Sequence, residues 1–183
     1  RDKTNKVGAK LILDVTQAAG AIPVDTKSWQ PDILVCSGYK WLGGHGGVGL
    51  AVVSDEINNK SPHAIGWMGA KNPFAMNASS LDLADGAQKF TQATMSYISV
   101  QGLTVSIKEL LKLGVDRIEK HSEQLKYILK SNLDGTNWKV SEPVKENSAS
   151  NHILTIETGN FSSKTLVSKL REKNLVCSSR NGK

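Results

Sequence analysis

Cysteine is scarce in this chain of 183 residues, which contains only Cys36 and Cys177. Two isolated thiols supply neither a disulfide framework nor the close pairs of ligands that a zinc site needs. We therefore predict reduced thiols and no metal centre. The chain also opens at Arg1 without a basic and apolar leader, so we expect no secretory signal and a cytoplasmic protein.

Long hydrophobic runs are absent as well. Hydrophobic residues make up 39% of the chain, yet no apolar stretch approaches the roughly 20 residues that a transmembrane helix requires. The net charge of +6 is carried by basic residues that are mixed with acidic ones, most visibly over 108–139. This mixture is typical of solvated helix faces. We expect neither a membrane nor a nucleic acid as a partner.

The chain does contain short apolar runs and longer helical patterns. Apolar runs of strand length occur at residues 11–14, 33–37 and 48–53. Helical spacing of apolar residues predicts helices over 99–113 and 115–133, and Gly114 supplies the stop between them. Residues 55–83 have several prolines and glycines and no clear period, so we predict an irregular excursion there.

The pattern changes after Gly135. We predict a strand over 138–140, an alternating strand over 152–157, a helix over 162–173 with Ser162 as its N-cap, and a strand over 175–178. Together these elements predict an α/β protein with two domains. Residues 1–114 carry the sheet, and residues 115–183 form a smaller α+β domain.

Lys40 is the best candidate for chemistry in the chain. It follows the predicted strand 33–37 and precedes a glycine-rich stretch, while Asp14 ends the upstream strand. Open α/β sheets bind ligands at the carboxyl ends of their strands, so these two side chains can face one crevice. We expect the Lys40 amine to be buried, where a low dielectric keeps it nucleophilic. An amine and a carboxylate there suit pyridoxal phosphate (PLP), which needs a lysine for its Schiff base and an acid beside its ring nitrogen.

Two ordered motifs resemble those of the class V aminotransferase family of PLP enzymes. The resemblance rests on DVTQAAGAIPVD at 14–25, followed by DILVCSGYK at 32–40 and GVG at 47–49. The family includes cysteine desulfurases, selenocysteine lyases, isopenicillin-N-epimerase-like proteins and kynureninases. It implies the fold-type I PLP-dependent transferase fold, with 1–114 as the C-terminal part of the PLP-binding large domain and 115–183 as an incomplete small domain.

The resemblance also implies a role for each residue of the motifs. Lys40 would be the Schiff-base lysine and the proton shuttle, and Asp14 would pair with the pyridine nitrogen. Gln17 would hydrogen-bond the phenolic oxygen of the cofactor. Ser37 would donate its hydroxyl to the phosphate, and Tyr39, which replaces the histidine of many members, can contact the same group.

Three further positions follow from the same resemblance. Thr16 stands where relatives often carry the alanine that packs under the ring. Thr94 ends a segment similar to one whose threonine reaches the phosphate of the neighbouring subunit, which implies a homodimer with the active site at the interface. The alternative is an ordinary loop threonine before a helix. The segment 65–69 resembles a Gly-Trp segment of kynureninase-like relatives, with an exposed Trp67 in a turn as its alternative.

As a function, the family implies a PLP enzyme that acts on a small amino acid as an aminotransferase or a lyase. Cysteine desulfurase and selenocysteine lyase are narrower alternatives, but Cys177 lies too early to match the sulfur-accepting cysteine of the related type. A catalytically inactive scaffold or dimerisation module is the competing hypothesis. Because relatives are longer, we expect a fragment that lacks the N-terminal half and the extreme C-terminus, with the ring-stacking residue and the substrate-carboxylate arginine outside it.

Overall fold

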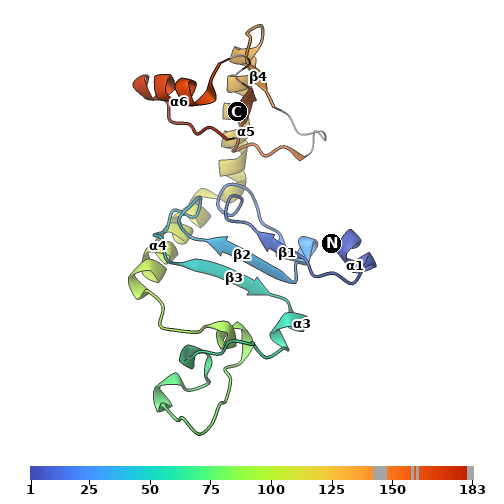
Figure 1. The fold of residues 1–183 in the computed structure, drawn as a ribbon, viewed down its shortest axis with the longest axis vertical. Helices are drawn as coiled ribbons and strands as arrows, with labels where there is room; N and C mark the ends of the chain where they lie inside the picture. The colour runs from blue at the N-terminus through green and yellow to red at the C-terminus, as the bar shows by residue number, and fades with distance from the viewer. Residues whose placement is uncertain (142–147, 158, 160, 181–183) are drawn as a thin grey trace. The chain divides into compact units, whose positions relative to one another are not determined.

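The computed structural model describes residues 1–141, 148–157, 159 and 161–180. The chain forms two compact units, Arg1–Asp116 and Arg117–Lys183. A three-stranded sheet lies in the first unit and a two-stranded sheet in the second (Figure 1). Across the described ranges, no helix is long and apolar enough to cross a membrane.

The sheet of the first unit is mixed: its central strand pairs with a parallel neighbour on one side and an antiparallel neighbour on the other. Its strands, in spatial order, are β1 (Ile12–Asp14), β2 (Ile33–Ser37) and β3 (Gly49–Val53) (Figure 1). β1 runs parallel to β2, and β3 runs antiparallel to it. The register aligns Asp14 with Val35, two residues before Ser37. The polar residues that end β1 and β2 therefore lie at the same edge of the sheet.

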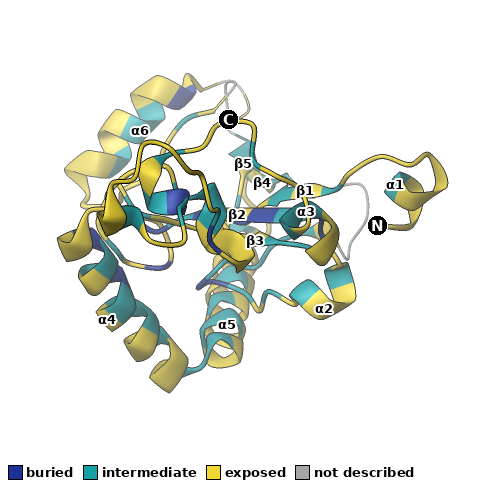
Figure 2. Ribbon diagram, turned by 90° about the horizontal axis from the view of Figure 1, so that it is seen from below, coloured by how far each residue is buried: buried dark blue, intermediate teal, exposed yellow. Residues whose placement is uncertain are grey.

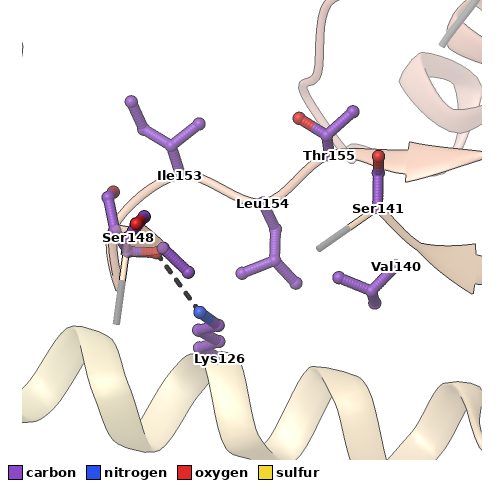
Figure 3. A pocket seen from close by; sticks show the side chains of 9 residues that line it. Lys126, Val140, Ser141, Ser148, Ile153, Leu154 and Thr155 are labelled. Carbon is purple, nitrogen blue, oxygen red and sulfur yellow. Dashed lines mark hydrogen bonds between the residues drawn. The ribbon is translucent and has the colours of Figure 1, made fainter. Parts of the chain in front are cut away.

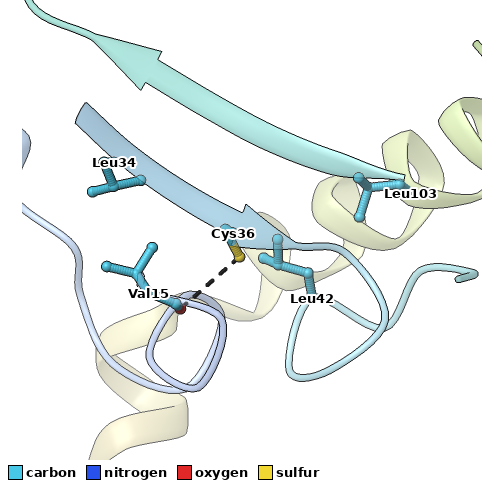
Figure 4. Packing of buried hydrophobic residues seen from close by; sticks show 5 residues of the cluster. All are labelled: Val15, Leu34, Cys36, Leu42 and Leu103. Carbon is cyan, nitrogen blue, oxygen red and sulfur yellow. Dashed lines mark hydrogen bonds between the residues drawn. The ribbon is translucent and has the colours of Figure 1, made fainter. Parts of the chain in front are cut away.

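The core of the first unit lies between one face of this sheet and α4 (Tyr97–Leu113). Its buried members are Val15, Leu34, Cys36, Leu42 and Leu103 (Figure 4). Leu34 and Cys36 alternate along β2 with half-exposed neighbours, as the period of a strand requires. Leu103 enters from α4 and is only 3% exposed. Packing against this cluster is what holds α4 on the sheet.

The predicted apolar stripe of α4 is partly right. Ile107 and Leu110 pack beside Leu103 against the core, whereas Leu111, whose apolar side chain also counted toward the helical spacing of 99–113, is exposed. Much of α4 outside the stripe is exposed (Figure 2). Leu111 follows Leu110 by one position, which turns it about 100° away from the core around the helix.

An ion network closes the opposite, amino end of β2. Asp32 is 2% exposed and accepts a hydrogen bond from the backbone N–H of Leu11 at 2.7 Å. Its carboxylate also pairs with the guanidinium of Arg1 and lies 3.6 Å from the ammonium of Lys10. The Leu11 N–H and then the Arg1 hydrogen bond lower the pKa of Asp32 to about 2. A charged carboxylate is thus part of the contact between the start of β1 and β2.

The remaining elements of the first unit are short. They are the α-helices α1 (Asp2–Lys6), α2 (Thr26–Trp29) and α3 (Asp55–Asn58), and the 3-10 turns η1 (Trp67–Gly69), η2 (Pro73–Ala75) and η3 (Gly86–Phe90). Asp25 caps α2 by accepting from the N–H groups of Lys27 at 3.0 Å and Ser28 at 3.1 Å. The excursion predicted over 55–83 is therefore irregular in the main, but it begins with the turn of helix α3 and includes η1 and η2.

The second unit combines two helices with a small sheet. Its elements are α5 (Val115–Leu133), which begins two residues before the unit, β4 (Lys139–Val140), β5 (Ile156–Glu157) and α6 (Ser163–Glu172). β4 and β5 pair in antiparallel fashion. The Ser162 hydroxyl accepts from the N–H of Thr165 at 3.5 Å, as expected of the predicted N-cap. The helices predicted over 99–113 and 115–133 are confirmed, with α4 beginning two residues earlier at Tyr97.

Three predicted strands of this unit are wrong in extent or existence. The alternating run 152–157 pairs only at Ile156 and Glu157, and 138–140 only at its last two residues. Residues 175–178 form no strand within the described part of the chain, and Val176 is 84% exposed. An apolar run becomes a strand only where a neighbouring strand takes its backbone hydrogen bonds, and a pattern along one segment carries no information about such a neighbour.

Candidate active site

The end of β1 presents a charged carboxylate. Asp14 is the last residue of the strand and is exposed, and its Oδ1 accepts from the backbone N–H of Thr16 at 2.9 Å. The N–H of Val15 still donates to the carbonyl of Val35 at 2.9 Å, so the chain stays paired to β2 one residue past β1. The hydroxyl of Thr16 and then its N–H hold the pKa of Asp14 below its usual value. Asp14 is therefore ionised at neutral pH.

Thr16 connects this carboxylate to the end of β2. Its Oγ1 accepts a hydrogen bond from the backbone N–H of Ser37 at 3.0 Å. Ser37 is the last residue of β2 and is half-buried. Two of the predicted site residues, Asp14 and Ser37, are thereby bonded to the same threonine, Asp14 to its backbone N–H and Ser37 to its hydroxyl.

The loop that carries Lys40 is closed by its own backbone. The N–H of Gly44 donates to the carbonyl of Gly38 at 2.8 Å, and the N–H of Gly43 donates to the carbonyl of Lys40 at 2.9 Å. Leu42 points into the core and is 7% exposed (Figure 4). Lys40 therefore occupies the turn of a loop that is anchored on both sides of it.

Glycines let this loop lie directly against α4. A Cβ atom at Gly38 would lie 3.0 Å from Cδ2 of Leu103, and one at Gly44 would lie 2.8 Å from its Cδ1. A side chain at either position would require the end of Leu103 to shift, so the two glycines allow the loop to approach α4 with Leu103 in its present position. The same leucine that fills the core thus also supports the lysine loop.

A second close approach joins the lysine loop to the turn after β1. That turn is held by the carbonyl of Val15, which accepts from Ala18 at 2.9 Å and from Ala19 at 2.8 Å, and it carries the exposed Gln17. At Gly20, where φ is +93°, a Cβ atom would lie 2.6 Å from the carbonyl oxygen of Trp41. The turn that bears Gln17 and the loop that bears Lys40 are therefore in backbone contact.

One expectation about Lys40 is wrong for the described chain: its side chain is exposed, not buried. Its ammonium lies 4.9 Å from the ring centroid of Tyr39, which is itself 53% exposed. The reason is the position of the loop, which extends beyond the last residue of β2 while its anchors, Leu42 among them, point inward. The loop is thus anchored by buried groups such as Leu42, while the amine of Lys40 stays exposed.

Thr94 lies apart in sequence from the residues above. It is exposed in an irregular stretch three residues before α4 begins, and its predicted role in a neighbouring subunit stays a prediction. The stretch before it does pack against the Gly-Trp segment, because a Cβ at Gly66 would lie 1.7 Å from the carbonyl oxygen of Gln92. Trp67 in that segment is 43% exposed and meets the ring of Phe74 edge-on at 5.7 Å.

The hollows of the second unit contain none of the predicted site residues. One of about 370 Å³ lies beside α5 (Figure 3), lined by Lys126, Val140, Ser141, Ser148, Ala149, Ser150, Ile153, Leu154 and Thr155. The Lys126 ammonium donates to the carbonyl of Ser150 at 3.4 Å, so its charge is directed at the wall of this hollow. Among the residues with a described position, no three His, Cys, Asp or Glu side chains gather as metal ligands.

Sequence reasoning missed the two residues that join the predicted ones. It read Thr16 only as a replacement for an alanine under the cofactor ring, and it gave Gly20 no role. A threonine two positions after a strand-ending aspartate is a recognisable turn signal, because its N–H and hydroxyl can both reach the carboxylate. The contact of Gly20 with Trp41 joins residues 21 positions apart, and no local sequence pattern predicts it.

The sequence and the fold both match known proteins. Residues 2–183 match the family model described as Aminotransferase class-V. An uncharacterized aminotransferase, YcbU of Bacillus subtilis, is 31% identical over 119 residues, which are 64% of this chain and 31% of that protein. A kynureninase of Bacillus mycoides is 26% identical over 157 residues, which are 82% of this chain and 37% of the kynureninase. The chain thus spans about a third of the length of these relatives.

Solved structures confirm the fold. The apo cysteine desulfurase of Thermococcus onnurineus superposes with a TM-score of 0.81 at 20% identity, covering 96% of this chain and 43% of that one. The predicted α/β fold of PLP-dependent fold-type I transferases is therefore correct.

Proposed function

The chain belongs to the class V aminotransferase family, and on this premise we propose that it is the lysine-bearing part of a PLP enzyme that acts on a small amino acid. The observation that carries the proposal is the contact, at one sheet edge, of the turn after β1 with the end of β2 and the lysine loop that follows it. Thr16 joins Asp14 to Ser37, and Gly20 brings the turn of Gln17 against the loop of Lys40. The acid, the amide, the hydroxyl and the amine thus come from segments that touch.

The side chains present fit the cofactor of this family, pyridoxal phosphate. The charged Asp14 can accept from a protonated pyridine nitrogen and stabilise that proton by its opposite charge. Ser37 and Tyr39 bring hydroxyl donors for phosphate oxygens, and Gln17 brings an amide donor for the phenolic oxygen. When bound, the cofactor supplies an electron sink for bonds to the substrate α-carbon.

Lys40 has two tasks in this proposal. Its amine holds the cofactor by the aldehyde carbon, and once the substrate amine has replaced it, Nζ moves the proton at the substrate α-carbon. The anchored loop limits where Nζ can go, because Leu42 is buried and Gly38 packs under Leu103. We infer that residues outside this chain cover the exposed amine and grip the substrate carboxylate.

The test is reduction of the full-length protein with borohydride after incubation with PLP, followed by peptide mass analysis. We expect a pyridoxyl adduct on Lys40 and an absorbance band of the imine, both lost in Lys40→Ala. Lys112→Ala is the matched control, because Lys112 is an exposed helix lysine paired with Glu109 at 2.6 Å. A scaffold protein would take up no cofactor, and an adduct confined to another lysine would equally refute the role of Lys40.

We also propose that the enzyme works as a cytoplasmic homodimer in which Thr94 donates to the cofactor phosphate bound by the partner. In that arrangement Lys40→Ala and Thr94→Ala damage opposite halves of each site. Subunits of the two variants, coexpressed, would form mixed dimers with one intact site, and cofactor would be retained on Lys40 of the Thr94→Ala subunit. If coexpression restores no binding beyond that of Thr94→Ala alone, the shared site is wrong.

A further inference from the structure

Thr16 bonds to the ends of both strands, through its hydroxyl on one side and its backbone N–H on the other. Its Oγ1 accepts from the N–H of Ser37 at 3.0 Å, and its N–H donates to Oδ1 of Asp14 at 2.9 Å. A hydroxyl has one proton to donate and two lone pairs that accept. With the Ser37 N–H on a lone pair, the proton of Thr16 remains for the Asp14 carboxylate, and this bond is the largest cause that lowers the pKa of Asp14.

The position of Thr16 gives these contacts a consequence at the site. Val15, immediately before it, is buried in the core, so the backbone on that side is fixed. Ser37, which it holds through the backbone, is the last residue of β2 and lies three positions before Lys40. A carboxylate bonded to a free turn could rotate with that turn, whereas Asp14 is bonded to the N–H of a residue whose side chain is tied to the next strand.

We propose that Thr16 is a positioning residue: its hydroxyl ties the turn that holds the Asp14 carboxylate to the end of β2, so that this carboxylate would face the ring nitrogen of the bound cofactor. This inference rests on the proposed function. Thr16 itself moves no proton of the substrate. It acts through Asp14, by favouring the charged form and by setting the distance between that charge and the Lys40 loop.

Few other groups in the described part of the chain influence this carboxylate. The thiol of Cys36, from β2, is the titratable neighbour that responds to it: burial, and then the charge of Asp14, raise the pKa of that thiol. A neutral thiol places no charge beside Asp14 at neutral pH. The hydroxyl of Thr16 is therefore the side-chain contact to alter.

The experiment compares Thr16→Val, which keeps the shape and removes the hydroxyl, with Thr16→Ser, which keeps the hydroxyl. In the full-length, cofactor-free protein, the pKa of Asp14 is read from its carboxyl carbon by NMR. We expect it to rise toward the ordinary value in Thr16→Val and to stay low in Thr16→Ser. For PLP itself, loss of a hydrogen bond to a charged group should weaken binding about tenfold in Thr16→Val, with Thr16→Ser recovering most of the affinity.

The outcomes distinguish a failure of the role proposed for Thr16 from a failure of the proposed function. If the wild type forms no adduct on Lys40, the proposed function fails, while the NMR titration still decides whether Thr16 governs Asp14. If the adduct forms, an unchanged Asp14 pKa and unchanged PLP affinity in Thr16→Val overturn the role of Thr16 alone. Should Thr16→Val not fold, Thr16→Ala removes the same hydroxyl without placing a methyl group in its position and is read in the same way.

Discussion

Replacing Gly20 by alanine tests whether the contact between the two loops controls the lysine. Gly20 has a φ of +93°, and its would-be Cβ lies 2.6 Å from the carbonyl oxygen of Trp41. Trp41 directly follows Lys40, so a movement of Trp41 that relieves the clash also moves the lysine. The variant should therefore change the behaviour of Lys40 through the backbone alone, because alanine adds no charge and no hydrogen-bonding group.

Two costs add in this variant. A non-glycine residue in such a backbone conformation costs about 1–3 kcal/mol, against which the stiffer unfolded chain returns about 0.4–1 kcal/mol. In addition, ordinary van der Waals contact begins at 3.4 Å, so the carbonyl must retreat by 3.4 − 2.6 = 0.8 Å. A displacement of about 1 Å near a reacting group can cost on the order of 100-fold in rate.

The assay follows both costs in the full-length protein. Urea unfolding measures the free energy of unfolding, and stopped-flow absorbance measures the rate at which PLP reacts with Lys40. We expect Gly20→Ala to slow that reaction by about 100-fold. Gly8→Ala is the matched control, because Gly8 has a φ of +66° with no atom within 4 Å of its would-be Cβ. It carries the conformational cost without the contact.

The reasoning fails on a clear result. Suppose that Gly20→Ala and Gly8→Ala lose equal amounts of stability and that the rate at Lys40 is unchanged. The close approach of Gly20 to Trp41 would then not control the position of Lys40. A slower reaction in both variants would indicate that the effect comes from a general loss of stability, because Gly8 lies outside both loops.

Two further predictions concern stability. Leu103→Ala removes a side chain that is 3% exposed and supports the lysine loop, and it should lower the free energy of unfolding by about 2–5 kcal/mol in urea titrations; Val105→Ala on the exposed side of α4 should stay within about 0.5 kcal/mol of the wild type. The folded-state pKa of Asp32, at about 2, lies below the ordinary value of 3.8, so its stabilising contribution is present above pH 3.8 and is lost as the pH falls from there through 2. The melting temperature of Asp32→Asn should therefore depend less on pH in that window, and an unaltered pH profile would contradict the charge network.

The local pattern was sufficient for much of this molecule. Helices α4 and α5 follow from apolar spacing and from Gly114, which has a φ of +84° between them, because the helical period and the stop signal both lie within the segment itself. Asp14 and Lys40 could be singled out for the same reason. Each follows an apolar run of strand length, and the ends of parallel strands share an edge.

Only the tertiary structure decided what those residues touch. It placed Thr16 between Asp14, which accepts from its N–H, and the end of β2, which donates to its hydroxyl, and it left the Lys40 amine exposed where we expected burial. It also left residues 175–178 without the strand that their apolar character predicted, within the described chain. The physical reason is common to all three: hydrogen-bond partners and burial are supplied by segments distant in sequence, whereas periodicity, caps and breakers act over a few neighbouring residues.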